Sequence, residues 1–271
     1  MQKEEYLKKL ETELKLIKRS NLTIRNYLYF NKKLLESTNK DPEQLSEEDV
    51  KNFLASMSDK ASSSIILALA AIKFASIAIL KQDLTKDIKR PKKDKTLPSV
   101  LTKDEIKSLI DASQTRKSKL MIKFLYSTGL RVSELVNLKP QDLNLQEKTG
   151  IVKKGKGKKD RFFTLPEKLI DELQNYIEKH PKNQYLFSKD KPFTTRNIQK
   201  IIKKTAENAN IQKKVTPHTL RHSYATHLLE SGTDIRIIQV LLGHENLNTT
   251  QIYTHVSTEE IKKVKNPLDN L

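Results

Sequence analysis

The chain has 271 residues, of which 36% are hydrophobic, and its 51 basic against 33 acidic side chains give a formal net charge of +18. It has no cysteine, which excludes disulfides and thiolate metal sites. No apolar stretch follows the first residues, so we expect no signal peptide and a cytoplasmic protein. A chain this basic is typical of proteins that bind a polyanion, either nucleic acid or an anionic membrane surface. The alternative is that the lysines only keep the protein soluble.

The first 89 residues are predicted to form a helical domain. Leucines and isoleucines recur every three or four residues within 4–17 and again within 24–35, as on one face of a helix. Ser46, followed by three acidic residues, is typical of a helix N-cap with an acidic first turn. Residues 61–80 form the most apolar run, but a lysine and a serine interrupt it. We interpret it as a buried helix and not as a membrane span.

Residues 90–98 hold two prolines among dense charge, which predicts a linker to a second domain at 99–271. Thr102 begins a capping box at the start of that domain. The extended runs at 150–155 and 161–165 flank a connection rich in glycine and lysine, which predicts a β-hairpin. The fold is therefore expected to be mainly α with a small β-hairpin or sheet. Further helices are predicted near residues 166–179, 194–209, 218–230, 234–242 and 248–255, with a last one from residue 257.

His218, Arg221 and His222 would share one face of a helix. An arginine neutralises a phosphate, and a histidine exchanges a proton near pH 7. The spacing alone does not say which histidine acts with Arg221. One alternative is an ordinary basic helix face. Another is a metal site built on the two histidines, but no glutamate stands between them and no third ligand is obvious.

Other residues give weaker signals when each is taken alone. Arg131 follows a glycine at a predicted helix–helix turn, and the alternative is a surface arginine paired to Glu134. His244 follows Gly243, which also suits a helix C-cap with a histidine placed favourably for the helix dipole. The lysines of the hairpin could each merely touch a DNA backbone. Tyr253 lies on a short helix, where a lone tyrosine is usually a packing residue.

Taken in order, these segments resemble the tyrosine recombinases, specifically the Xer type. The resemblance covers the whole second domain, and the N-terminal helices look like the core-binding domain of that family. It therefore implies a two-domain DNA clamp. The motifs that carry it are Thr-Gly-Leu-Arg-Val-Ser-Glu-Leu at 128–135, the hairpin at 155–161, His-Thr-Leu-Arg-His at 218–222, Leu-Gly-His at 242–244, and Tyr253.

The resemblance implies a set of six catalytic residues. They are the phosphate-binding Arg131 and Arg221, the general acid/base His218, the hairpin Lys156, the further phosphate ligand His244 and the nucleophile Tyr253. His222 falls outside this set and is expected to support the site or to contact DNA. Two arginine forks can neutralise the negative charge that builds up on the phosphate in the transition state, and this replaces a metal ion. We therefore expect no cofactor and no metal.

The implied function is site-specific recombination of double-stranded DNA through a 3′-phosphotyrosyl intermediate, by a tetramer on two synapsed sites. Chromosome or plasmid dimer resolution is favoured over a mobile-element integrase, because no arm-binding domain precedes the N-terminal helices. Two further alternatives are a type IB topoisomerase-like activity and a catalytically silent DNA-binding protein. The tail at 257–271 suits docking into a neighbouring subunit, or else packing on its own domain.

Overall fold

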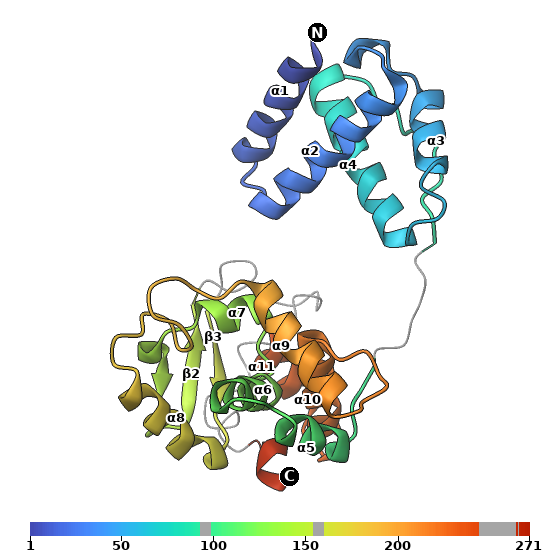
Figure 1. Ribbon diagram of the computed structural model, residues 1–271. Coiled ribbons are helices and arrows are strands. Elements are labelled where there is room, and N and C mark those ends of the chain that lie inside the picture. Colours follow the sequence, from blue (N-terminus) through green and yellow to red (C-terminus); the bar gives the residue numbers. More distant parts are fainter. Residues whose placement is uncertain (93–98, 154–159, 244–263, 265) are drawn as a thin grey trace. The chain divides into compact units, whose positions relative to one another are not determined.

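The computed structural model describes residues 1–92, 99–153, 160–243, 264 and 266–271. These residues are mostly helical with a small antiparallel sheet, which confirms the predicted fold class. The chain divides into two compact units, Met1–Thr96 and Leu97–Leu271, and each has a hydrophobic core of its own (Figure 1).

Helices α1 (Lys3–Leu16), α2 (Asn21–Thr38), α3 (Glu47–Ala55) and α4 (Ser62–Leu80) make up the first unit, with a 3-10 turn η1 (Pro42–Gln44) before α3. The hydroxyl of Ser46 accepts the backbone N–H of Asp49, which confirms the predicted cap of α3. The buried amide of Asn31 donates to the carbonyl oxygen of Ala71 at 3.1 Å and accepts from the hydroxyl of Tyr6 at 3.0 Å. This one polar side chain therefore joins α1, α2 and α4 inside the core.

Helix α4 is long and apolar enough to cross a membrane, judged by length and composition alone. However, the face that carries Ala68, Ala71, Ile72 and Ala75 is buried inside the first unit. Its neighbours are α1, α2 and α3. We therefore describe α4 as the core helix of this unit.

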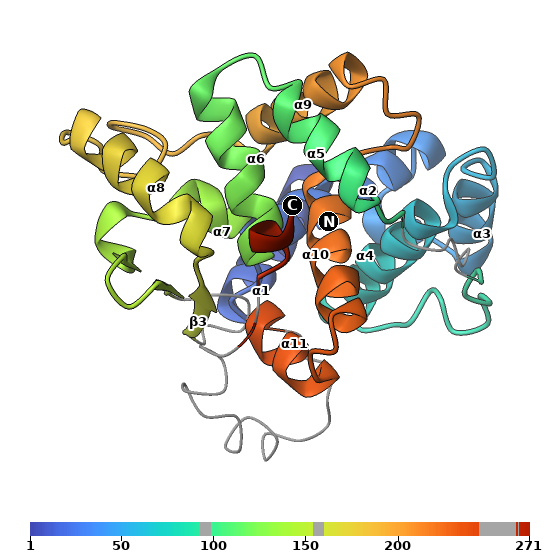
Figure 2. The same cartoon turned by 90° about the horizontal axis from the view of Figure 1, so that it is seen from below.

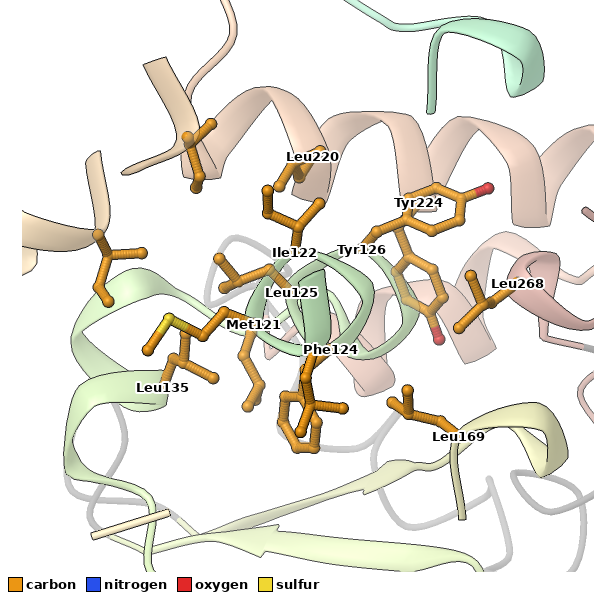
Figure 3. Packing of buried hydrophobic residues seen from close by; sticks show 14 of the residues in the cluster. Met121, Ile122, Phe124, Leu125, Tyr126, Leu135, Leu169, Leu220, Tyr224 and Leu268 are labelled. Atoms are coloured by element: carbon orange, nitrogen blue, oxygen red, sulfur yellow. The ribbon is translucent and has the colours of Figure 1, made fainter. Parts of the chain in front are cut away.

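Helix α6 (Arg116–Thr128) is the centre of the second unit and is buried along most of its length. Figure 3 shows its side chains directed outward on several sides, toward Leu220 and Tyr224 of α10 and toward Leu169 of α8. A helix surrounded by other elements must be apolar on more than one face, as this one is. Helices α5 (Lys103–Asp111), α8 (Glu167–Lys179) and α10 (Pro217–Glu230) pack on it. Helices α7 (Val132–Asn137), α9 (Thr195–Asn208) and α11 (Ile235–Leu242) also belong to this unit.

The sheet follows a 3-10 turn, η2 (Pro140–Asp142), and has the order β1 (Leu143–Asn144), β2 (Thr149–Val152), β3 (Arg161–Thr164). β2 and β3 pair antiparallel with Val152 opposite Arg161, which confirms the predicted hairpin. Strand β1 was not predicted, because two residues are too few to show alternation. Along β3, Phe162 is exposed and Phe163 is buried, so Arg161 shares the inward face of the sheet.

The described end of the chain packs on its own unit. The final 3-10 turn, η5 (Pro267–Asn270), contacts α6, α8 and α10, and Figure 2 shows it in dark red beside α6 and α10. The amide of Asn266 donates to the carbonyl oxygen of Ser127 at 2.7 Å, and Leu268 is buried in the core. Residues 266–271 thus follow the second alternative for the tail, while residues 257–263 lie outside the described residues.

Candidate active site

Two helices of the second unit end at glycines whose backbone is left-handed, and their ends lie together. Gly129 caps α6 with φ of 60°, and Gly243 caps α11 with φ of 61°. A Cβ on Gly129 would lie 2.6 Å from the side chain of Leu242 and 2.7 Å from that of Tyr224, and one on Gly243 would lie 2.7 Å from Arg161. Glycine is therefore required at both positions by conformation and by space. The last carbonyls of both helices remain available to side-chain donors.

Arg131 is the N-cap of α7 and lies two residues after Gly129, the C-cap of α6. Its Nη1 donates to Oε1 of Glu134 at 2.8 Å, and its Nη2 donates to the carbonyl oxygen of Gly243 at 2.9 Å. Oε2 of Glu134 also accepts the backbone N–H of Arg131 at 2.8 Å. The side chain of Glu134 is 7% exposed and that of Arg131 is 22% exposed. The pairing offered as an alternative thus exists, but it is a largely buried brace and not a surface ion pair.

Arg221 reaches the same place from α10 and is 5% exposed. Its Nη1 donates to the carbonyl oxygen of Gly129 at 2.6 Å, and its Nη2 donates to that of Leu242 at 2.5 Å. Both acceptors belong to helix C-termini, where the helix dipole favours a cation. The structure therefore brings together Arg131 and Arg221, the two arginines singled out in the sequence.

Arg161 is a third arginine in this cluster, and no role is predicted for it from the sequence. Its Nη1 donates to the carbonyl oxygen of Leu241 at 2.7 Å, and its Nη2 donates to Oε2 of Glu134 at 2.5 Å. The side chain is 11% exposed. The signal for it was the alternation along its strand, where residue 163 is an apolar inward position and residue 161 must share that face.

The charges of this cluster do not balance within the described part of the chain. Glu134 is the carboxylate that pairs with Arg131 and Arg161, whereas Arg221 is held by carbonyls alone. Burial, and after it the charges of Arg131 and Arg161, lowers the pKa of Arg221 to about 9. Burial acts to raise the pKa of Glu134, but the two arginines outweigh it and hold that pKa below its usual value. An anion would relieve the excess positive charge, so the cluster is suited to bind a phosphate.

His218 and His222 lie on the exposed side of α10, in its first two turns. Burial lowers the pKa of His222, and the charges of His218 and Arg221 add to this effect. Arg221 points the other way, into the unit. Among the described residues, no group of three or more histidines, aspartates or glutamates could hold a metal ion, so the metal-site alternative gains no support there.

Three of the six predicted catalytic residues, Lys156, His244 and Tyr253, lie outside the described residues. The described chain does reach the residues next to the segments of Lys156 and His244. Lys156 belongs to the hairpin connection that leads into Arg161. His244 is the next residue after Gly243, whose carbonyl oxygen accepts from Arg131.

An open hollow of about 740 Å³ lies beside Arg131, lined by residues of α7, η2 and β2. Lys139 and Lys153 are among its lining residues, and Lys153 forms an ion pair with Asp142 at 2.7 Å. Glu134 and Asp142 also line the hollow, so its cations and carboxylates nearly balance, and Lys139 is one of its basic side chains.

Comparisons with known proteins agree with this geometry. The model of the phage integrase family matches residues 99–260. The tyrosine recombinase XerA of Pyrococcus furiosus is 41% identical over 282 residues, which cover 98% of this chain and 96% of that protein. The crystal structure of a XerA recombinase is 36% identical, covers 96% of both chains and gives a TM-score of 0.53. A lambda integrase tetramer bound to a Holliday junction gives a TM-score of 0.74 over 92% of this chain and 80% of that one; at 18% identity it shows a likeness of fold.

Proposed function

The chain belongs to the phage integrase family as a tyrosine recombinase, and we propose that it cleaves and rejoins DNA at a specific site through a 3′-phosphotyrosyl intermediate. The observation that carries this proposal is the cluster of Arg131, Arg161 and Arg221, in which, among the described residues, the carboxylate of Glu134 pairs with the first two and carbonyl oxygens hold the third. A basic cluster of this kind, set in a chain with a net charge of +18, suits a phosphodiester of DNA.

Arg131 and Arg221 are proposed to bind the non-bridging oxygens of the scissile phosphate. Helix-end carbonyls already hold both guanidinium groups, at 2.5 to 2.9 Å. Their positive charge is therefore in place before the transition state forms, and little reorganisation is needed when negative charge builds up on the phosphate.

Tyr253 is proposed as the nucleophile, with His218, His244 and Lys156 around the phosphate. The phenolic oxygen forms a bond to phosphorus while the bond from phosphorus to the 5′-oxygen breaks. A tyrosine hydroxyl has an unperturbed pKa of about 10, so His218 accepts its proton, and Lys156 donates a proton to the departing 5′-oxygen. The products are a 3′-phosphotyrosine and a free 5′-hydroxyl. The reverse steps rejoin the strand, and the bond energy is kept without ATP.

The helical unit at 1–89 is proposed to be the core-binding domain and residues 99–271 the catalytic domain, so that the two clamp the duplex through the linker at 90–98. The hollow beside Arg131 would take the DNA backbone next to the cleaved phosphate. Two duplexes require four active sites, so the proposed working form is a tetramer on synapsed DNA, the state named for the lambda integrase structure.

We further propose a Xer-type role in chromosome or plasmid dimer resolution, which places the enzyme with the chromosome in the cytoplasm. The likeness to XerA over nearly the full length of both proteins supports this role over that of a mobile-element integrase. Mapping the cleavage positions on genomic DNA distinguishes the two roles, because a resolvase cleaves a chromosomal site and an integrase cleaves the ends of an element.

A DNA suicide substrate, nicked next to the scissile phosphate so that the cleaved end diffuses away, tests this proposal. The covalent protein–DNA complex is expected to form in EDTA at the rate seen with magnesium. The charge needed at the phosphate is supplied by Arg131 and Arg221, and the proton transfers have candidate side chains. Chelation that stopped the covalent complex, with magnesium restoring it, would contradict the metal-free mechanism.

The same substrate separates the remaining alternatives. A silent DNA-binding protein would bind it without forming the complex. A topoisomerase-like enzyme would also relax supercoiled plasmid that carries no cognate site, whereas a site-specific recombinase requires the site.

A further inference from the structure

Arg161 contacts three segments of the second unit at once. It extends from β3, directly after the hairpin connection that carries Lys156. One end of its guanidinium donates to the carbonyl oxygen of Leu241 in α11, and the other donates to Glu134 in α7. These bonds connect the hairpin to α11, which precedes His244, and to α7, whose N-cap is Arg131.

Each group that holds Arg131 also contacts Arg161. Glu134 is shared, with Oε1 accepting from Arg131 at 2.8 Å and Oε2 accepting from Arg161 at 2.5 Å. Gly243, whose carbonyl oxygen accepts from Arg131, lies against the Arg161 side chain so closely that a Cβ there would be 2.7 Å from Cδ of Arg161. Loss of the Arg161 guanidinium would therefore leave Glu134 with one arginine partner instead of two, and would remove the bond to Leu241, two residues before Gly243.

The surroundings of Arg161 do not suit a direct phosphate ligand. Its side chain is 11% exposed, against 22% for Arg131. Unlike Arg221, which donates to carbonyl oxygens, Arg161 pairs with the carboxylate of Glu134, so part of its charge is already neutralised. Its Nε is buried and has no hydrogen-bond partner within the described part of the chain. These contacts suit a residue that supports the phosphate-binding groups.

We propose that Arg161 is a positioning residue, which fixes the guanidinium of Arg131 for phosphate binding by bracing Glu134 and Gly243. This inference rests on the proposed function, in which Arg131 neutralises the scissile phosphate. Arg161 also joins β3 to α11, so that it holds in place the described residues next to the segments of Lys156 and His244.

The competing explanation is that Arg161 only stabilises the fold. The two explanations differ in which cleavage reactions become slower when Arg161 is replaced. A misplaced Arg131 impairs the neutralisation of phosphate charge, whereas a less stable fold slows every reaction of the site alike. A substrate whose scissile phosphate carries no charge therefore separates them.

Arg161→Met and Arg161→Lys are tested on two suicide substrates, one with the natural phosphodiester and one with a methylphosphonate at the scissile position. The methyl group replaces a charged non-bridging oxygen, so the arginines have less charge to neutralise. Single-turnover cleavage rates are measured at saturating protein, with DNA affinity and melting temperature recorded for each variant. Arg131→Lys serves as the positive control. Phe187→Leu serves as the structural control, because this buried ring packs on Phe124 and Tyr176.

Arg161→Met is expected to cleave the phosphodiester roughly 100-fold more slowly than the wild type, the scale of loss for a misplaced catalytic group. On the methylphosphonate, Arg161→Met is expected to cleave within about threefold of the rate of the wild type on the same substrate. The transition state of this substrate depends less on arginine charge. The rate at which Arg161→Lys cleaves the phosphodiester should lie between those of Arg161→Met and the wild type. The ammonium of lysine can replace at most one of the two hydrogen bonds that the guanidinium donates. DNA affinity should stay within about threefold for both variants, because the side chain is largely buried.

Equal slowing on both substrates, the pattern expected for Phe187→Leu, would overturn the positioning role. If Arg161→Met does not fold, Arg161→Lys and Glu134→Gln decide the question by the same ratio of rates. Failure of the proposed function looks different. In that case wild-type protein forms no covalent complex, or Arg131→Lys cleaves the phosphodiester as fast as the wild type does.

Discussion

Tyr253→Phe is expected to abolish the covalent protein–DNA complex, with a loss of at least about 10⁴-fold, and to leave DNA affinity within about twofold of the wild type. The substitution removes one hydroxyl, the group proposed to attack the phosphate. It keeps the ring and every basic side chain that holds the DNA. The measurement is the yield of protein–DNA adduct on a suicide substrate in a denaturing gel, beside a binding titration with the same DNA.

The matched control is Tyr126→Phe, which removes a tyrosine hydroxyl elsewhere in the same unit. The hydroxyl of Tyr126 lies 2.8 Å from Nδ1 of His227, and both groups are buried. Losing that hydrogen bond should lower the free energy of unfolding by about 1 kcal/mol and leave the adduct intact. Adduct formation by Tyr253→Phe at the wild-type rate would refute the nucleophile assignment.

Arg221→Lys is expected to slow single-turnover cleavage by about 10²- to 10³-fold. Lysine keeps the positive charge, but its compact ammonium cannot hold the carbonyls of both Gly129 and Leu242 and bind the phosphate as well. The conservative change is preferred to Arg221→Ala, which would leave a cavity and two buried carbonyls without their donors. The melting temperature of each variant shows whether the lost rate is a loss of fold.

Arg236→Lys is the matched control, since Arg236 is an exposed residue near the start of α11. It should cleave within about twofold of the wild type. A rate for Arg221→Lys within threefold of the wild type would show that the phosphate does not depend on the fork of Arg221.

Local features of the fold could be predicted from the sequence because their causes are local. A serine or threonine with an acidic residue three positions later satisfies the first N–H groups of a helix, and the boxes at Ser46 and Thr102 mark the starts of α3 and α5. The hairpin was predicted from its two extended runs. The contacts of Asn31 and Asn266 could not be predicted, because each joins elements that are distant in sequence.

The two arginines of the candidate site could be named from the sequence, but the contacts that hold them could not. Arg131 and Arg221 were identified by resemblance, since no spacing argument relates residues 90 positions apart. Helix spacing placed His218 and His222 on one face together with Arg221. The structure separates them, because Arg221 is buried and the two histidines are exposed. The role of Arg161 depends on the ends of α7 and α11, which sequence patterns do not bring together.

The most direct test of the account is to identify the residue that carries the DNA. Wild-type protein is trapped on a suicide substrate, the DNA is trimmed with nuclease, and the protein is digested and mapped by mass spectrometry. We expect a nucleotide attached through its 3′-phosphate to the hydroxyl of Tyr253. A nucleotide on any other residue, or one attached through its 5′-phosphate, would contradict it.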